Sequence, residues 1–206
     1  MTVPVPTELA PLRRAEPDTL ARLRAGLADR AAAGDLLDLA YTTADSPVGA
    51  LLLVATARGL VRVAFERQDH DAVLAALAAS TSPRILRAPR RLEPVVRELE
   101  EYFTGRRRTF DLPLDLSPDP GFRSAVRRLL PSIGYGRTVS YTELASLAGR
   151  PTAVRAVASA CATNPLPVVV PCHRVLRSDG SLGGYLGGLE AKRTLLDLEV
   201  AGSVAP

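Results

Sequence analysis

The chain has 206 residues, of which 47% are hydrophobic, and this composition fits a folded globular protein rather than a disordered one. Its net charge of +4 is uneven, because residues 1–115 carry 16 basic and 16 acidic side chains whereas residues 116–206 carry 10 and 6. A basic half is typical of a domain that binds a polyanion, but an ordinary basic surface would give the same count.

Several classes of protein are disfavoured by what the sequence lacks. No apolar run approaches the ~18 residues of a membrane-spanning helix, and the first residues do not have the layout of a signal peptide. The only cysteines are Cys161 and Cys172, so a disulfide framework is improbable and the reducing cytoplasm is the predicted location.

The first 116 residues predict an extension followed by a small α+β domain. Residues 1–35 form the extension, with an amphipathic helix from Asp18 to Arg30 that has Asp18 as its N-cap. Residues 36–116 form the N-terminal domain, in which short turns separate segments of alternating or continuous apolar character. Its expected elements are a meander of strands Leu36–Thr43, Ala50–Ala57 and Leu60–Glu66, helices Asp69–Ala79 and Arg90–Phe103, and an edge strand Thr109–Leu116.

Residues 117–206 predict a mostly helical C-terminal domain after a proline-rich linker, 117–121. Ser140 and Glu143 have the spacing of a capping box, so a helix should begin there and run to about Ala148. A glycine-containing turn and a second helix, from Pro151 or Thr152 to about Thr163, complete a helix-turn-helix of the winged-helix kind. Two further helices flank this unit, Phe122–Leu130 before it and Leu189–Glu199 after it.

The segment Asn164 to Tyr185 carries the chemistry of the chain. At its centre Cys172 precedes a histidine and an arginine, each of which could favour the reactive thiolate. An isolated Cys-His pair means little, since most free cysteines are small buried hydrophobic residues. Here, however, the pair has prolines before it and the glycine-rich run 183–188 after it, which lets the backbone approach a ligand closely.

These motifs resemble, in order, those of the O6-alkylguanine-DNA alkyltransferases. Pro-Cys-His-Arg-Val at 171–175 matches the active-site signature, and Asn164-Pro165, Gly-Tyr-x-Gly-Gly at 184–188 and the Leu-Leu-x-x-Glu ending at 195–199 match its companions. Upstream, Val139-Ser140-Tyr141 and the segment 153–157 match the DNA-binding helices of the family. The resemblance covers roughly residues 40 to 200 and is densest in the last half.

The resemblance implies a single-turnover transfer of an alkyl group from O6-alkylguanine in DNA, with O4-alkylthymine as a further substrate to consider, to a cysteine of the protein. It assigns Cys172 as acceptor, His173 as base acting through a water, Glu199 as the residue that orients His173, Asn164 as a brace of the turn, and Tyr141 as donor to the guanine. It implies no cofactor, and the single histidine and missing cysteines of the N-terminal domain predict no structural zinc there.

The partner implied is double-stranded DNA containing alkylated guanine, bound by a monomer that flips the base out of the helix. Arg155 is the expected finger that fills the vacated stack. The other DNA-binding residues expected are Thr152, Ala153, Ala156, Ser159, Arg174 and Ser178. The substrate pocket is expected to be lined by Tyr185, Leu186, Gly183, Pro167 and Val175.

Two other functions fit parts of the pattern. A nonreactive alkyltransferase-like protein would bind lesions without repairing them, but such proteins lack the cysteine that this chain has at 172. A thiol hydrolase could use Cys172 and His173, although neighbours on an extended strand point to opposite faces and no oxyanion motif is evident. Leu186 stands where family members often have a small residue or arginine, which affects the range of alkyl groups accepted.

Overall fold

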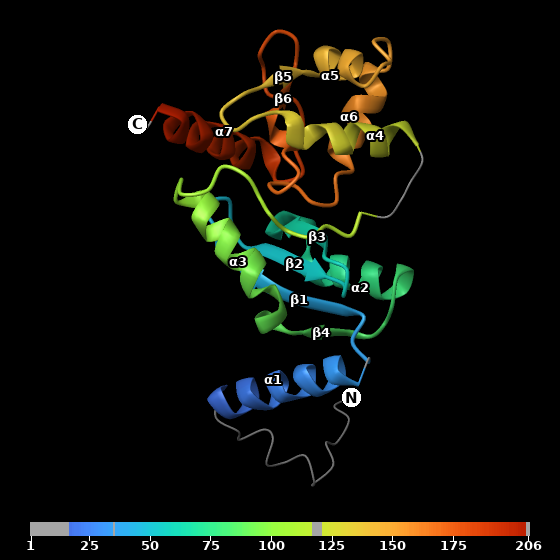
Figure 1. Cartoon of the computed structure of the whole chain (residues 1–206), viewed down its shortest axis with the longest axis vertical. Helices are drawn as coiled ribbons and strands as arrows, with labels where there is room; N and C mark the ends of the chain where they lie inside the picture. Colours follow the sequence, from blue (N-terminus) through green and yellow to red (C-terminus); the bar gives the residue numbers. More distant parts are fainter. Residues whose placement is uncertain (1–16, 35, 117–120, 205–206) are drawn as a thin grey trace, which may run out of the picture.

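The computed structural model describes residues 17–34, 36–116 and 121–204. It contains two stacked α+β units, with the N-terminal domain below the C-terminal one in Figure 1. The predicted linker lies outside the described residues, apart from Gly121. Within the described ranges, no helix is long and apolar enough to cross a membrane, and no three His, Cys, Asp or Glu side chains gather as a metal site would require.

The sheet of the N-terminal domain has four strands in the order β3-β2-β1-β4. Strands β1 (Leu39–Ala44), β2 (Leu51–Ala55) and β3 (Leu60–Phe65) form the antiparallel meander that the sequence predicts. The fourth strand, β4 (Ile85–Arg87), runs parallel to β1. The predicted edge strand Thr109–Leu116 is wrong, because within it only Leu114 forms an isolated bridge, to Leu60 at the other edge of the sheet.

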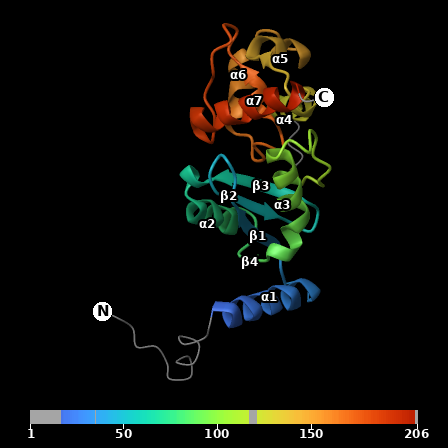
Figure 2. The ribbon, with the colours of Figure 1, turned by 90° about the vertical axis from the view of Figure 1, so that its left-hand side faces the viewer.

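Helices cover both faces of this sheet, α2 (His70–Ser80) on one and α3 (Pro89–Phe103) on the other. The alternation of strand side chains explains why: Leu52 and Val54 face α2, whereas Leu51 and Leu53 face α3. Asp69 caps α2 by accepting from the backbone N–H groups of Asp71 and Ala72. The first helix, α1 (Pro17–Ala33), lies by β4, away from the C-terminal domain (Figure 2). It begins at Pro17, so the predicted cap Asp18 is already inside the helix.

The C-terminal domain contains the predicted helix-turn-helix. Helices α4 (Phe122–Leu129), α5 (Tyr141–Leu147) and α6 (Val154–Ala162) pack together, and α7 (Gly188–Val204) closes the domain. The capping box forms, since Ser140 Oγ accepts from Glu143 N–H at 3.1 Å and Glu143 Oε2 accepts from Ser140 N–H at 2.6 Å. Helix α6 starts two to three residues later than predicted, because Pro151 and Thr152 remain in the turn.

A short parallel pairing links the helix-turn-helix to the cysteine segment. Strands β5 (Val139–Ser140) and β6 (Val175–Leu176) pair directly, so the residue that opens α5, Tyr141, is held beside the end of the segment. Sequence inspection did not detect this pairing, since each strand has two residues. It fixes the predicted DNA-binding unit relative to the predicted reactive residue.

Candidate active site

The active-site loop, Asn164–Val175, is buried except at Pro165, which is partly exposed. Asn164 organises it: its side-chain amide donates to the Val170 carbonyl at 2.8 Å and to Cys172 Sγ at 3.2 Å, while its Oδ1 accepts from the Leu166 N–H at 3.1 Å. One side chain therefore bonds three points of the loop and fixes the position of the sulfur.

Within this loop, Val168 has a backbone φ of 73° and is fully buried. A β-branched residue rarely adopts this left-handed conformation, which costs of order 1–3 kcal/mol. Strain of this kind persists only where surrounding contacts determine the conformation, and the three Asn164 hydrogen bonds are such contacts.

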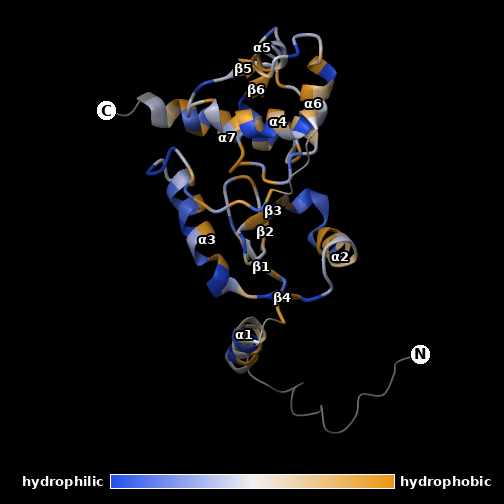
Figure 3. Cartoon of the chain, turned by 45° about the vertical axis from the view of Figure 1, so that its right-hand side comes forward, coloured by the Kyte–Doolittle hydropathy of each residue, from blue (hydrophilic) through white to orange (hydrophobic). Residues whose placement is uncertain are grey.

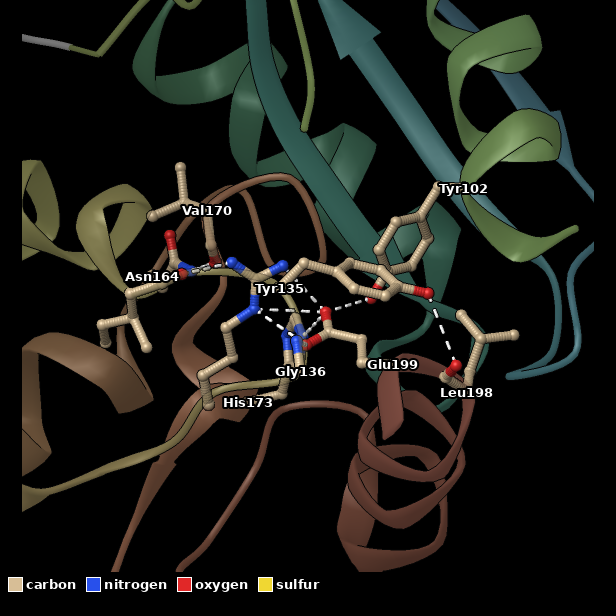
Figure 4. Close-up of polar contacts among 10 residues, drawn as sticks. Tyr102, Tyr135, Gly136, Asn164, Val170, His173, Leu198 and Glu199 are labelled. Atoms are coloured by element: carbon tan, nitrogen blue, oxygen red, sulfur yellow. Dashed lines mark hydrogen bonds and ion pairs between the residues drawn. The ribbon is translucent and has the colours of Figure 1, made fainter. Parts of the chain in front are cut away.

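The chain turns through a single 3₁₀ turn at Cys172–Arg174, all three residues of which are buried. The turn separates neighbouring side chains, as the sequence suggests for adjacent residues. The Cys172 sulfur accepts from Asn164. His173 Nε2, by contrast, lies 2.9 Å from Glu199 Oε1 (Figure 4). The other ring nitrogen, His173 Nδ1, is buried and has no hydrogen-bond partner among the described residues.

Glu199 reaches the site from the interior of α7, and its side chain is 1% exposed. We expected the closing helix to end at Glu199, and this is wrong, because α7 continues to Val204. The carboxylate has four partners: His173, Arg174, the Gly136 N–H at 3.1 Å and the Tyr102 hydroxyl at 2.7 Å. Glu199 is therefore neither on the surface nor at a fraying helix end.

Arg174 is not a DNA-contacting residue as predicted. Its side chain is buried, with Nη2 2.8 Å from Glu199 Oε1 and Nη1 donating to the Ile133 carbonyl. The guanidinium also lies over the Tyr135 ring. An arginine next to a catalytic pair in sequence could face either the DNA or the protein, and here the buried carboxylate of Glu199 binds it.

Burial and neighbouring charges shift the pKa values of Cys172, His173 and Glu199 in different directions. Burial raises the pKa of Cys172 to about 11, although the Asn164 hydrogen bond and the Lys192 charge oppose the shift. Burial lowers the pKa of His173 below its ordinary 6.5, against the effect of Glu199. For Glu199, burial alone would raise the pKa, but the hydrogen bonds from His173 and Arg174 outweigh it and lower the value to about 2.

These shifts correct the expectation that the neighbours of Cys172 favour the thiolate in the free protein. At neutral pH the thiol is protonated, the imidazole is neutral and the carboxylate is ionised. A neutral imidazole retains a lone pair and can accept a proton. The site without DNA therefore contains a protonated thiol and an imidazole that is free to accept a proton.

A testable consequence concerns the free thiol. In the absence of DNA, Cys172 should react slowly with iodoacetamide at pH 7, and the rate should rise as pH approaches about 11. Mass spectrometry of the modified chain across this pH range measures it, with unfolded protein as the reference for an accessible thiol. Full modification at pH 7 at the rate of the unfolded chain would contradict the raised pKa.

The expected pocket residues and Tyr141 differ in their burial and in their neighbours. Burial raises the pKa of Tyr141 to about 12, so its hydroxyl keeps its proton at neutral pH. A Cβ at Gly183 would lie 2.5 Å from that hydroxyl, so only glycine lets Tyr141 occupy this position. The Tyr185 ring packs edge-on against Phe65, with centroids 5.5 Å apart. Leu186 is partly exposed, whereas Pro167 and Val175 are buried within the loop.

The predicted DNA-binding residues lie along α6 and the turn before it. Thr152 and Arg155 are exposed, while Ala153, Ala156 and Ser159 are partly exposed. Arg155 has no hydrogen bond or ion pair with any part of the chain that the structure describes. Ser178 is exposed in the turn after β6. The helix thus presents small side chains together with the exposed guanidinium of Arg155.

Three residues that contribute to the site were given no role from sequence. Tyr102 and Gly136 donate to Glu199, and Lys192, fully buried, donates through Nζ to the Val175 carbonyl at 2.6 Å. For Tyr102 no local signal existed, because its partner lies 97 residues away.

Comparisons with known proteins match both domains. Residues 39–116 match the ribonuclease-like domain, and residues 121–201 the DNA-binding domain, of 6-O-methylguanine DNA methyltransferase. The chain is 40% identical over 159 residues to the methylated-DNA–protein-cysteine methyltransferase of Mycolicibacterium paratuberculosis, covering 77% of this chain and 91% of that protein. It is 38% identical over 167 residues to the rat protein of that name, covering 75% and 78%.

Longer relatives and solved structures agree with these matches. The chain spans only 47% of the Escherichia coli bifunctional transcriptional activator/DNA repair enzyme Ada, to which it is 39% identical over 168 residues, 81% of this chain. The Mycobacterium tuberculosis O6-methylguanine methyltransferase structure superposes with a TM-score of 0.71 at 37% identity, covering 82% of this chain and 95% of that one. Its DNA complex gives 0.70 at 36% identity, covering 79% and 94%.

The chain therefore belongs to the O6-alkylguanine-DNA alkyltransferase family, and it has both domains of that family. It is a DNA-repair alkyltransferase, a methylated-DNA–protein-cysteine methyltransferase. The nonreactive lesion-binding alternative is not favoured, since the relatives are named as transferases and Cys172 is present.

Proposed function

We propose that Cys172 Sγ is the acceptor of the alkyl group of O6-alkylguanine in double-stranded DNA. The new bond joins sulfur to the alkyl carbon, and the carbon–oxygen bond to guanine breaks with its electron pair going to the base. The thiol proton leaves toward His173, and the guanine gains a proton from Tyr141. The observation that carries this proposal is the buried array in which Asn164 holds the sulfur and Glu199 holds His173.

His173 fits the role of base because of its tautomer and its surroundings. With Nε2–H donated to the Glu199 carboxylate, Nδ1 carries the lone pair, and this is the buried nitrogen without a partner among the described residues. We propose that it takes the Cys172 proton through one water molecule. The imidazolium that forms is then stabilised by the carboxylate, as in a catalytic triad.

Tyr141 fits the role of proton donor to the leaving guanine. Its phenol is protonated at neutral pH because of burial, and it stands at the start of α5 beside Gly183. Charge that develops on the base as the bond breaks is stabilised by a donor placed in advance. The thioether product is stable, so each chain is proposed to react once, as a monomer, because Asn164, Cys172, His173 and Glu199 come from one chain.

The alkylated base must leave the duplex to reach Cys172, a residue that is 2% exposed. We propose that α6 enters the minor groove and that Arg155 fills the gap left by the flipped base. The small side chains of Ala153, Ala156 and Ser159 let the helix approach a narrow groove closely. The reducing interior of the cell, in the cytoplasm, is the proposed location, because the reaction needs a free thiol.

We expect Arg155→Ala to weaken repair of duplex DNA far more than reaction with free O6-benzylguanine base. Opening a base stack costs a few kcal/mol, and an inserted side chain offsets part of that cost only in the duplex. The loss in the duplex reaction should be on the order of tenfold to a hundredfold, measured as the second-order rate of label transfer. Arg97→Ala, an exposed arginine on α3, is the matched control. Equal losses on both substrates would show that Arg155 is structural only.

DNA affinity should fall as salt is added, with little dependence on sequence. The charge excess of the chain lies entirely in residues 116–206, and released counterions make the logarithm of the affinity fall linearly with that of salt concentration, by about 0.9 per phosphate contacted. Fluorescence anisotropy with two unrelated duplexes, across a series of salt concentrations, measures both points. A flat salt dependence would contradict the assignment of this half as the polyanion-binding one.

A further inference from the structure

The N-terminal domain contributes a side chain to the reactive array. Tyr102 lies near the end of α3, is fully buried, and donates its hydroxyl to Glu199 Oε1 at 2.7 Å, the same oxygen that faces His173 Nε2 (Figure 4). We propose that Tyr102 is a positioning residue for alkyl transfer, which holds the Glu199 carboxylate so that it stays aimed at His173. This inference rests on the proposed roles of His173 and Glu199.

Packing alone does not account for a tyrosine at this position. The Tyr102 ring belongs to an aromatic cluster with Phe103, Phe110 and Tyr135, at centroid distances of 5.3, 5.2 and 6.0 Å. A phenylalanine would fill the same space. A fully buried hydroxyl is unfavourable unless it is hydrogen-bonded, and Glu199 provides that bond.

The hydroxyl is a permanent donor. Burial, followed by the neighbouring Glu199 charge, raises the pKa of Tyr102 far above its usual value, so the phenol keeps its proton at every pH at which the protein works. Glu199 is ionised over the same range, so the hydrogen bond always runs from phenol to carboxylate. Such a bond to a charged acceptor is stronger than one between neutral groups.

The donors around Glu199 come from two sides. Arg174 and the Gly136 N–H belong to the C-terminal domain and reach both carboxylate oxygens, whereas Tyr102 approaches Oε1 from the N-terminal domain. Oε1 also accepts from Arg174 Nη2 at 2.8 Å, so without Tyr102 this oxygen is held from the C-terminal domain alone and shifts from the position in which it faces the imidazole. A displacement of this kind lowers the ability of His173 to accept a proton while the fold remains intact.

Other residues of the N-terminal domain also contact the active-site loop and the residues beside it. The Val63 N–H of β3 donates to the Pro165 carbonyl at 2.9 Å, next to Asn164. Phe65, on the same strand, packs against Tyr185, and the Tyr185 ring in turn lies 6.3 Å from His173. Tyr102 thus adds a side-chain hydrogen bond to a set of contacts that the N-terminal domain makes with the site.

The test is Tyr102→Phe, with Tyr135→Phe as the matched control. The Tyr135 hydroxyl lies in the same aromatic cluster but approaches the Leu198 carbonyl, at 3.4 Å, rather than the carboxylate. At saturating DNA and pH 7, Tyr102→Phe should lower the rate of methyl transfer about tenfold, the size expected for one lost hydrogen bond to a charged group. The affinity for DNA should be unchanged, and the control should transfer at the wild-type rate.

A double-mutant cycle separates positioning from structure. In a His173→Asn background, where the base is gone, Tyr102→Phe should cause no further loss of rate, because its effect passes through His173. The same loss in both backgrounds, or a wild-type rate for Tyr102→Phe alone, would overturn the proposal. A wild-type rate for His173→Asn alone would instead remove the base assignment, and this inference with it.

An NMR measurement distinguishes a loss of positioning from a slow transfer that arises only because the variant is less stable. The chain has only two histidines, His70 and His173, so the imidazole proton of His173 can be assigned by NMR using the His173→Asn variant. We expect this resonance to move in Tyr102→Phe and not in Tyr135→Phe, in the full-length folded protein. An unmoved resonance would overturn the proposal.

Discussion

Label on the methyl group of O6-methylguanine in duplex DNA is expected to move to Cys172, one equivalent per chain, and Cys172→Ser is expected to abolish the transfer. Serine is nearly the same size but its hydroxyl stays protonated, whereas the thiol can lose its proton to His173. Removing a nucleophile of this kind lowers a rate by several orders of magnitude. Peptide mapping of the labelled protein identifies the acceptor.

Cys161→Ser is the matched control for that experiment. Cys161 is also a buried free thiol, in α6, and burial raises its pKa to about 12. Its replacement should therefore leave both the stoichiometry and the site of labelling unchanged. Label found on Cys161, label released to solvent, or more than one equivalent transferred per chain would each refute Cys172 as the single acceptor.

Glu199→Gln is expected to slow alkyl transfer and to destabilise the fold. The amide leaves the buried Arg174 guanidinium without its counter-charge, and breaking a buried ion pair in this way costs about 3–5 kcal/mol of unfolding free energy. The amide also cannot stabilise the imidazolium of His173. The transfer rate at pH 7 should fall at least about tenfold, and its pH profile should shift to higher pH.

The free energy of unfolding of Glu199→Gln should also change less with pH, in the acid range, than that of the wild type. The Glu199 pKa is about 2 in the folded chain and 4.5 when unperturbed, so its carboxylate stabilises the fold fully above pH ~4.5 and loses that effect as pH falls toward 2. Glu199→Gln removes this dependence. Denaturant unfolding and transfer rates from low to high pH test both statements, with Glu190→Gln, exposed on the same helix, as control. If the transfer rate depends on pH in the same way for wild type and Glu199→Gln, Glu199 has no role in the mechanism.

Sequence periodicity predicted most of the elements, because local signals specify them. The meander has turns at Gly49 and Gly59, both with positive φ, and α5 has its capping box. The three-residue strand β4 was missed because it is too short for alternation to be visible, and its pairing with β1 is a tertiary contact. Apolar and polar residues alternate along Thr109–Leu116, yet only Leu114 forms a bridge to a strand.

The candidate site was predicted in part, and only through the resemblance of its motifs. The residues brought together by the structure include Cys172, Asn164, His173 and Glu199. The predicted end of the closing helix at Glu199 is wrong, since α7 continues past this residue. Partners distant in sequence, such as Tyr102 and the Gly136 N–H, leave no local pattern. The orientation of Arg174 likewise depends on a carboxylate 25 residues away.

The left-handed backbone of Val168 has a consequence for the thermodynamics of DNA binding. The loop around it is already buried and internally bonded before DNA arrives, so its conformational entropy is lost when the chain folds and not when the complex forms. A flexible loop would lose that entropy on binding, and this loss would weaken the affinity for every lesion. The heat capacity change on binding should therefore reflect the surface covered by DNA, without the additional decrease in heat capacity that accompanies coupled folding. The free protein and the complex should share one loop conformation.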